Sequence, residues 1–260
     1  MKKHNLNPLI KLAILGIVIF IVLFSIIGYL GLSLRNLNYF KIKDIAVNKP
    51  ELAFDFSYLL ERNIFNIDLK KESRYISELY PVYKNIRLFR ILPNRLFIIF
   101  TERTPLAYVK LYRYFCVDSD AVLFELAQGQ SVLDLPVITG LERKILGPKP
   151  GKQYNIKELI IALNIIREIG TNSSFKKYKI ERIDVVNPAN TSCFIQLARY
   201  TKGQVLADFP VLEVKLGEDD IRDKIGVLAG LFTQSQDDIS NIKYIDLRFK
   251  EPVIKFKDAR

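Results

Sequence analysis

Histidine is almost missing from this chain. His4 is the single histidine among 260 residues, and it precedes a long apolar run. A Ser–His or Cys–His nucleophile needs an imidazole beside the nucleophilic side chain. A zinc site without histidine would need both cysteines together with carboxylates, which is a rare ligand set. We therefore expect neither a histidine-dependent hydrolase nor an ordinary zinc centre after the apolar run.

Cysteine is scarce as well, because Cys116 and Cys193 are the only two. Both lie in apolar, strand-like segments, where a small buried thiol is the common outcome. The alternative is a disulfide, which an oxidising compartment would permit. The two residues are far apart in the sequence, so the sequence does not establish that they meet.

Motifs for phosphate and calcium binding are also missing. The chain has no GxxxxGK[ST] or GxGxxG loop and no Asp-x-Asp-x-Asp-Gly loop. Three pairs of nearby acids do occur, and turns or helix starts explain them without catalysis. These pairs are Asp118 with Asp120, Asp219 with Asp220, and Asp237 with Asp238. We predict a protein that is not an enzyme and that has no cofactor, metal or small-molecule substrate.

What the sequence does have is one uncharged apolar run at residues 12–34, between Lys11 and Arg35. As a helix this run would be roughly 35 Å long, enough to cross a hydrocarbon core of about 30 Å. The alternative is a cleaved secretory signal, since a small-x-small triplet occurs at Gly31-Leu32-Ser33. Signal cores are only about 7–15 residues long, so we predict a retained transmembrane helix.

The charges around the run indicate its orientation. Lys2, Lys3 and Lys11 lie in a short tail without acids, which favours a cytoplasmic N-terminus. Residues 35–260 are then expected outside, as periplasmic or extracytoplasmic domains. Lys2, Lys3 and Lys11 account for three units of the formal net charge of +11, so residues 35–260 carry +8. This surplus could draw them towards anionic lipids, anionic wall polymers or an acidic partner. Nucleic acid is not expected on that side of the membrane.

The pattern of expected strands and helices changes near Thr104-Pro105 and divides residues 35–260 there. The predicted organisation is a cytoplasmic tail at 1–11, the transmembrane helix at 12–34, a small domain at 35–104 and a larger one at 105–260. In the small domain, a strand is expected at 40–47, a short helix at 57–62, a helix between Asp68 and Pro81, and strands at 82–92 and 95–102 around a Pro93-Asn94 turn. The order is β-α-α-β-β.

The larger domain shows short strands interrupted by two helices. Residues 108–117 and 121–125 predict a hairpin around Asp118-Ser119-Asp120. Asn155 and Glu158 predict a capping box for one helix that Gly170 ends, and the acids at 218–220 precede the other. Further strands are expected at 183–186, 193–198, 205–207, 212–216 and 244–256. The fold class is therefore α+β, with a mixed α/β sheet in the larger domain.

The arrangement resembles the FtsQ/DivIB family of bacterial cell-division proteins over nearly the whole chain. The motifs that carry the resemblance are Phe40-x-Ile42-x-x-Ile45-x-Val47, Ile64-Phe65-Asn66-Ile67-Asp68, Leu92-Pro93-Asn94-Arg95-Leu96, Glu102-Arg103-Thr104-Pro105-Leu106-Ala107, the hairpin at 116–124, Leu135-Pro136-Val137-Ile138-Thr139-Gly140 and Tyr244-Ile245-Asp246-Leu247-Arg248-Phe249. The resemblance implies that the small domain is a POTRA domain and that the larger one is the family's β domain.

The resemblance also implies a scaffold at the division septum, in the cell (inner) membrane, that recruits FtsB/DivIC-like and FtsL-like partners and helps to regulate septal peptidoglycan synthesis. In this family the last strand of the C-terminal sheet accepts a strand from the FtsB-like partner. The matching residues are Arg248, Phe249, Lys250, Glu251, Val253, Ile254, Lys255 and Phe256. Pro252 departs from the family pattern, because it lacks a backbone donor and predicts a break or bulge.

Other interpretations stay open. Lys250, Pro252, Lys255 and Lys257 would equally protect an exposed sheet edge from aggregation. The basic run of Lys84, Arg87, Arg90 and Arg95 is either a second contact surface or a solvated face. POTRA-type domains also dock peptides in envelope protein secretion or assembly, where a β-barrel of strands of about ten alternating residues follows. Two helices are predicted here instead.

Overall fold

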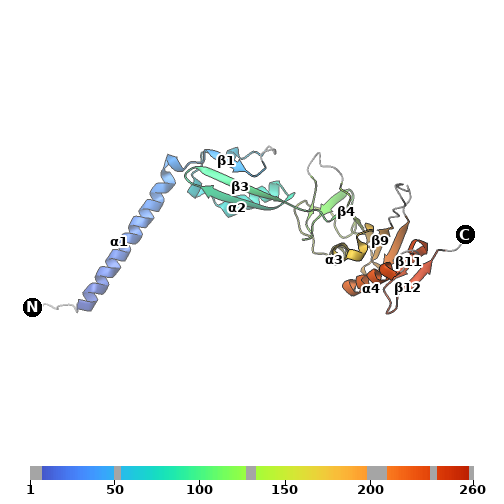
Figure 1. Cartoon of the computed structure of the whole chain (residues 1–260). Helices are drawn as coiled ribbons and strands as arrows, with labels where there is room; N and C mark the ends of the chain where they lie inside the picture. The colour runs from blue at the N-terminus through green and yellow to red at the C-terminus, as the bar shows by residue number, and fades with distance from the viewer. Residues whose placement is uncertain (1–7, 50–53, 127–132, 198–209, 235–238, 258–260) are drawn as a thin grey trace, which may run out of the picture. The chain divides into compact units, whose positions relative to one another are not determined.

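The computed structural model describes residues 8–49, 54–126, 133–197, 210–234 and 239–257 (Figure 1). The chain divides into two compact units. The first contains Met1–Leu79 and Tyr83–Thr101, and the second contains Tyr80–Val82 and Glu102–Arg260.

A long helix, α1 (Pro8–Asn36), contains the predicted transmembrane run. Its window Leu12–Tyr29 is apolar and long enough to cross a membrane, and none of it is buried inside the protein. A large apolar surface of this kind on a helix is stable in lipid rather than in water. The helix is therefore consistent with the expected anchor.

The first unit is built on a three-stranded sheet of order β1-β3-β2. Its elements are the 3-10 turns η1 (Asn38–Phe40), η2 (Ser57–Leu59) and η3 (Ile64–Asn66), the helix α2 (Leu69–Leu79) and the strands β1 (Asp44–Val47), β2 (Tyr83–Ile91) and β3 (Arg95–Glu102). Asp68 caps α2 as predicted, because its carboxylate accepts hydrogen bonds from the N–H groups of Lys70 and Lys71. The turn between β2 and β3 also lies where Pro93-Asn94 predicts it.

Two expectations for the first unit are wrong in detail. The strand expected at 40–47 begins only at Asp44, because the Ile42 backbone bonds to Arg62 and Glu61 instead of a neighbouring strand. The helix expected at 57–62 is only the 3-10 turn η2. Glu61 has a positive φ of 61°, which an α-helix does not tolerate.

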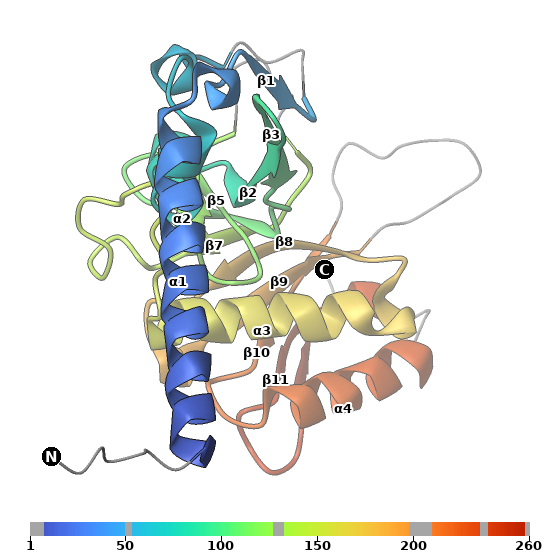
Figure 2. The same cartoon turned by 90° about the vertical axis from the view of Figure 1, so that its left-hand side faces the viewer.

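The second unit contains a nine-stranded sheet of order β12-β11-β10-β9-β8-β7-β4-β5-β6. The strands are β4 (Ala107–Lys110), β5 (Tyr114–Val117), β6 (Leu123–Phe124), β7 (Val137–Thr139), β8 (Lys179–Asp184), β9 (Ser192–Gln196), β10 (Val211–Lys215), β11 (Ile242–Asp246) and β12 (Val253–Phe256). The helices α3 (Lys157–Thr171) and α4 (Ile221–Gln234) lie on one face of this sheet (Figure 2).

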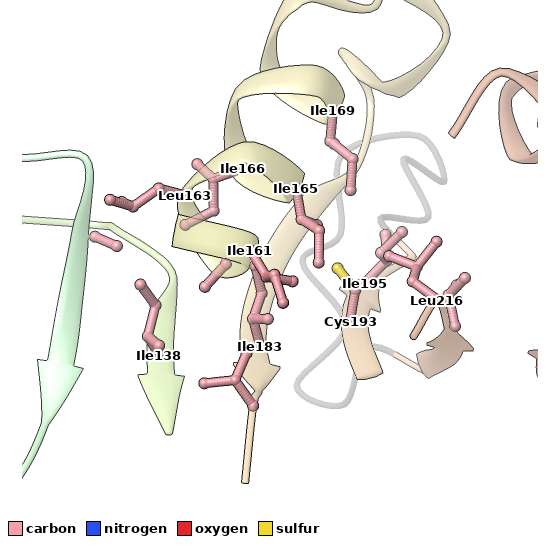
Figure 3. Packing of buried hydrophobic residues seen from close by; sticks show 14 of the residues in the cluster. Ile138, Ile161, Leu163, Ile165, Ile166, Ile169, Ile183, Cys193, Ile195 and Leu216 are labelled. Carbon is pink, nitrogen blue, oxygen red and sulfur yellow. The ribbon is translucent and has the colours of Figure 1, made fainter. Parts of the chain in front are cut away.

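The core of the second unit lies between these helices and the sheet. Ile161, Ile165 and Ile169 of α3 point towards Ile183 of β8 and Cys193 of β9 (Figure 3). Cys116 and Cys193 are both buried free thiols, so the structure has no bridge between them. Burial raises the pKa of the Cys116 thiol to about 11 and that of Cys193 to about 12.

Several elements of the second unit differ from their predicted bounds. Residues 108–117 form two antiparallel strands, β4 and β5, instead of one. The strands expected at 183–186, 193–198 and 212–216 are shifted by one to four residues as β8, β9 and β10. The strand expected at 205–207 and the acids Asp237 and Asp238 lie outside the described residues.

The predicted start of α3 is also wrong. Ile156 occupies the N-cap position and makes no side-chain cap. Glu158 pairs with Lys144 at 3.1 Å instead of completing a capping box. The helix runs past Gly170 to Thr171, because Gly170 does not adopt the positive φ of a glycine that ends a helix.

Candidate partner-binding edge

The predicted last strand at 244–256 is in fact two antiparallel strands, β11 and β12. The chain reverses between them, so Arg248, Phe249, Lys250 and Glu251 lie in a connection and not in a strand. Only Val253, Ile254, Lys255 and Phe256 of the predicted contact residues belong to the final strand. A composition of alternating apolar and polar residues suits either arrangement, which is why the sequence did not separate them.

The strand β12 lies at one edge of the nine-stranded sheet. It pairs with β11 on its inner side, and no described strand pairs with its outer side. An edge strand exposes a row of backbone N–H and C=O groups that another strand can pair with. The edge position that strand addition requires is therefore present.

The register shows which backbone groups face outwards. The Leu247 N–H donates to the Lys215 carbonyl, on the β10 side of β11. Backbone groups alternate in direction along a strand, so those of Tyr244 and Asp246 face β12. Their partners Lys255 and Val253 consequently bond inwards.

The groups of Ile254 and Phe256, at the opposite alternation, point to the open side. The Lys257 N–H agrees with this assignment, because it bonds inwards to the Asn241 carbonyl. Pro252 comes two residues before Ile254, so its backbone also faces the open side. The N–H group that proline lacks would therefore not have bonded to β11. Of the break or bulge expected at Pro252, the break is present, because the pairing with β11 ends at Val253 and no bulge forms there. The shift in register lies instead between Ile242 and Tyr244 on β11.

The side chains of the edge divide between core and solvent. Ile254 packs against the core of the second unit. Val253 is 46% exposed and Phe256 is 56% exposed, although both belong to large apolar residue types. Val253 and Phe256 therefore expose apolar surface at this edge, while Ile254 between them in the sequence is held by the core.

The connection before β12 is held by Arg248. Its Nη2 lies 2.6 Å from Asp246 Oδ2, its Nε donates to Asp246 Oδ1 at 2.9 Å, and its Nη1 donates to Asn190 Oδ1. These hydrogen bonds and the adjacent positive charge hold the pKa of the Asp246 carboxyl below its usual value, and the same bonds raise the pKa of Arg248. Arg248 is therefore occupied within the unit.

Phe249 follows this anchored arginine and is 61% exposed. The Arg248 guanidinium carbon lies 5.8 Å from the centre of its ring, which is within cation–π distance. Phe249 lies in the connection and Phe256 lies in β12, so the two residues do not belong to one strand. Both rings are nevertheless exposed on the last hairpin of the sheet.

Two of the four cations of the basic run, Arg90 and Arg95, make contacts within the first unit. Arg90 donates to the carbonyls of Ile64 and Ile67 at 2.8 and 2.6 Å, which fixes the turn before α2. Arg95 pairs with Asp44 at 2.6 Å across β3 and β1. Lys84 and Arg87 are exposed on β2. The four cations thus do not form one uniform surface.

Among the described residues, no group of three or more His, Cys, Asp or Glu side chains gathers to hold a metal ion. Asp118 has a structural position, because its Oδ1 accepts bonds from the N–H groups of Asp120 and Val122 in the turn that the sequence predicts. Asp219 and Asp220 precede α4, and the Asp220 carbonyl accepts the Lys224 N–H.

Known proteins similar to this chain identify its family. The family model described as "Cell division protein FtsQ/DivIB, C-terminal" matches residues 107–248. The cell division protein FtsQ of Syntrophotalea carbinolica is 28% identical over 95% of this chain and 83% of its own length. FtsQ of Geotalea daltonii is 25% identical over 89% of this chain and 82% of its own length. DivIB of Clostridium acetobutylicum is 29% identical over 85% of this chain and 82% of its own length. The chain, with its N-terminal apolar helix, is thus a membrane-anchored protein that belongs to the FtsQ/DivIB family of cell-division proteins.

Proposed function

We propose that this protein is a non-enzymatic, single-pass scaffold of the division machinery that binds FtsB/DivIC-like and FtsL-like partners through the β12 edge. Through these partners it helps to regulate septal peptidoglycan synthesis. The observation that carries the contact is the open outer side of β12, towards which the backbone groups of Ile254 and Phe256 point. The family supports a role in division rather than in envelope protein secretion.

The eight proposed contact residues have different parts in this interaction. Ile254 and Phe256 offer backbone groups, while Val253, Phe256 and Phe249 offer exposed apolar surface. Lys250, Glu251 and Lys255 are exposed charges at the rim, which favour selectivity more than affinity. Arg248 positions the connection through Asp246. The first unit is proposed to be a POTRA domain in which 3-10 turns replace the first helix.

The orientation is a further part of the proposal. The N-terminus lies in the cytoplasm and both units lie outside, at the septum, as the lysines of the short tail favour. Alkaline phosphatase fused after Arg260 should be active in cells, because the enzyme matures only outside the cytoplasm. An inactive fusion, with a cytoplasmic reporter active at the same position, would contradict this orientation.

Two substitutions at Phe256 test strand addition. Phe256→Ala removes the exposed ring, whereas Phe256→Pro removes the ring and the outward N–H together. Proline is tolerated on the open side of an edge strand. The full chain in lipid nanodiscs would be titrated calorimetrically with the outer segment of an FtsB/DivIC-like protein from the same organism.

We expect Phe256→Ala to weaken binding about thirtyfold, as truncating an interface aromatic does. Phe256→Pro should weaken it about tenfold further, because one more hydrogen bond is lost. Tyr112→Ala is the matched control, since Tyr112 is a 71% exposed aromatic between β4 and β5. Equal affinities for the Ala and Pro variants would rule out backbone pairing. Wild-type affinity in both would mean that β12 is only a protected edge.

A further inference from the structure

The turn between β2 and β3 carries exposed apolar side chains. Leu92 is 58% exposed and Ile91 is 45% exposed, and they immediately precede Pro93 and Asn94. We call residues 91–94 the hairpin tip. Neither residue belongs to the buried core of the first unit, so about half of each apolar side chain faces solvent.

A short connection keeps the hairpin tip near the end of α1. The Lys43 N–H donates to the Asn94 carbonyl at 2.9 Å, and α1 ends at Asn36. The intervening residues can span at most about 25 Å even when fully extended. The 3-10 turn Asn38–Phe40 shortens this reach. The tip therefore cannot lie much farther than this distance from the end of α1.

The connection is also attached to the body of the first unit. The Asn63 side-chain amide donates to the Leu37 carbonyl at 3.4 Å. The Phe40 ring contacts the Phe65 ring at a centroid distance of 5.1 Å. Tyr39, beside them, is 65% exposed. Tyrosine is enriched where a membrane meets water, so its exposure immediately after α1 fits that environment.

Several cations belong to the segments that meet at the hairpin tip. Lys43 is exposed, and the side chains of Arg95 and Lys41 are 54% and 41% exposed. The acids facing them are Asp44, which is 2.6 Å from Arg95, and Glu61, which is 4.0 Å from Lys41. Arg90 adds a further positive charge on β2, so the local balance is basic. Basic residues beside exposed apolar ones are typical of segments that lie in the interface of an anionic membrane.

We propose that the hairpin tip is a second membrane contact, in which Ile91 and Leu92 enter the interfacial layer while Lys43 and Arg95 attract anionic headgroups. This contact holds the first unit against the bilayer and limits its swing about the end of α1. It needs only that α1 spans the membrane and is independent of the partner proposed for β12.

The test places one fluorescent label on the full-length chain in vesicles of phosphatidylcholine and phosphatidylglycerol. Leu92→Cys is labelled with an environment-sensitive dye, and some lipids carry a nitroxide near the glycerol end of the acyl chain. Leu79→Cys is the matched control. Leu79 is also an exposed apolar residue of the first unit, at 53% exposure, and it is the last residue of α2. The unsubstituted chain gives the background, since Cys116 and Cys193 are buried.

The label at position 92 should be strongly quenched, and the label at position 79 should not. Lys43→Gln should reduce quenching at position 92, as should replacing phosphatidylglycerol by phosphatidylcholine. Equal quenching at positions 92 and 79, or none at 92, would overturn the proposed contact. Quenching at position 92 that responds neither to lipid charge nor to Lys43→Gln would overturn the role of the cations.

Discussion

Arg248 Nη2 lies 2.6 Å from Asp246 Oδ2 at the start of the connection between β11 and β12. The Asp246 carboxylate is buried and also accepts the Arg248 backbone N–H at 3.1 Å. The Arg248 side chain thus bonds back to Asp246, two residues earlier, and holds the start of the connection that returns the chain to the sheet edge as β12. The geometry of the proposed binding strand depends on this pair.

Asp246→Asn should lower the free energy of unfolding by about 1–3 kcal/mol near neutral pH, because charged hydrogen bonds to a buried carboxylate are lost. The Arg248 bonds hold the pKa of Asp246 below the ordinary value of 3.8. The ionised Asp246 carboxylate therefore contributes its full stabilisation above pH 3.8, and this contribution is lost as the pH falls through the lower pKa of the folded state. Denaturant unfolding of wild type and variant should show a difference that shrinks below about pH 4. A difference independent of pH would contradict the role of the charge.

Arg103 and Asp118 form a second ion pair that should matter for stability. Their atoms Nη1 and Oδ2 are 2.6 Å apart, with side chains only 11% and 3% exposed, and Arg103 Nε also donates to the Pro81 carbonyl. Arg103→Ala leaves the Asp118 carboxylate buried beside no cation, so it should cost about 3–5 kcal/mol. The matched control is Arg113→Ala, which breaks the half-exposed pair with Glu125 at 2.5 Å and should cost under about 1 kcal/mol. If thermal or denaturant unfolding shows that the two variants lose similar free energies of unfolding, the buried pair does not contribute more to stability than the half-exposed pair.

The two cysteines should resist modification in the folded chain. Burial raises their thiol pKa values to about 11 and 12, so little thiolate exists near neutral pH and reagents cannot reach it. Mass spectrometry after iodoacetamide treatment should find both thiols free and largely unmodified in the native protein. Both should be alkylated after unfolding. A disulfide, or rapid alkylation of native Cys193, would disagree with the structure.

Features determined by local chemistry could be predicted from the sequence. The apolar run, the Asp68 cap and the turn at Asp118 each depend on a few neighbouring residues, and the structure contains all three. The two main helices of the second unit were also recognisable from their apolar spacing. The family could be inferred because its motifs combine such local signals in a fixed order.

Features determined by distant contacts could not be predicted. The capping box of Asn155 and Glu158 does not form, because Glu158 pairs with Lys144 from another loop. The strand expected at 244–256 is divided by a connection in which Arg248 bonds to Asp246 and Asn190, and residue spacing does not encode the Asn190 contact. The outward direction of the Ile254 and Phe256 backbone groups depends on the register with β11, and that register requires the folded sheet.

Residue-resolved hydrogen exchange on the full-length chain tests the central claim most directly. In the free protein, the amides of Val253 and Lys255 should be protected by β11, while those of Ile254 and Phe256 should exchange quickly. Adding the outer segment of the FtsB/DivIC-like partner should slow exchange at Ile254 and Phe256 and leave the other two unchanged. If the partner binds and exchange at Ile254 and Phe256 stays fast, the partner does not add a strand to β12.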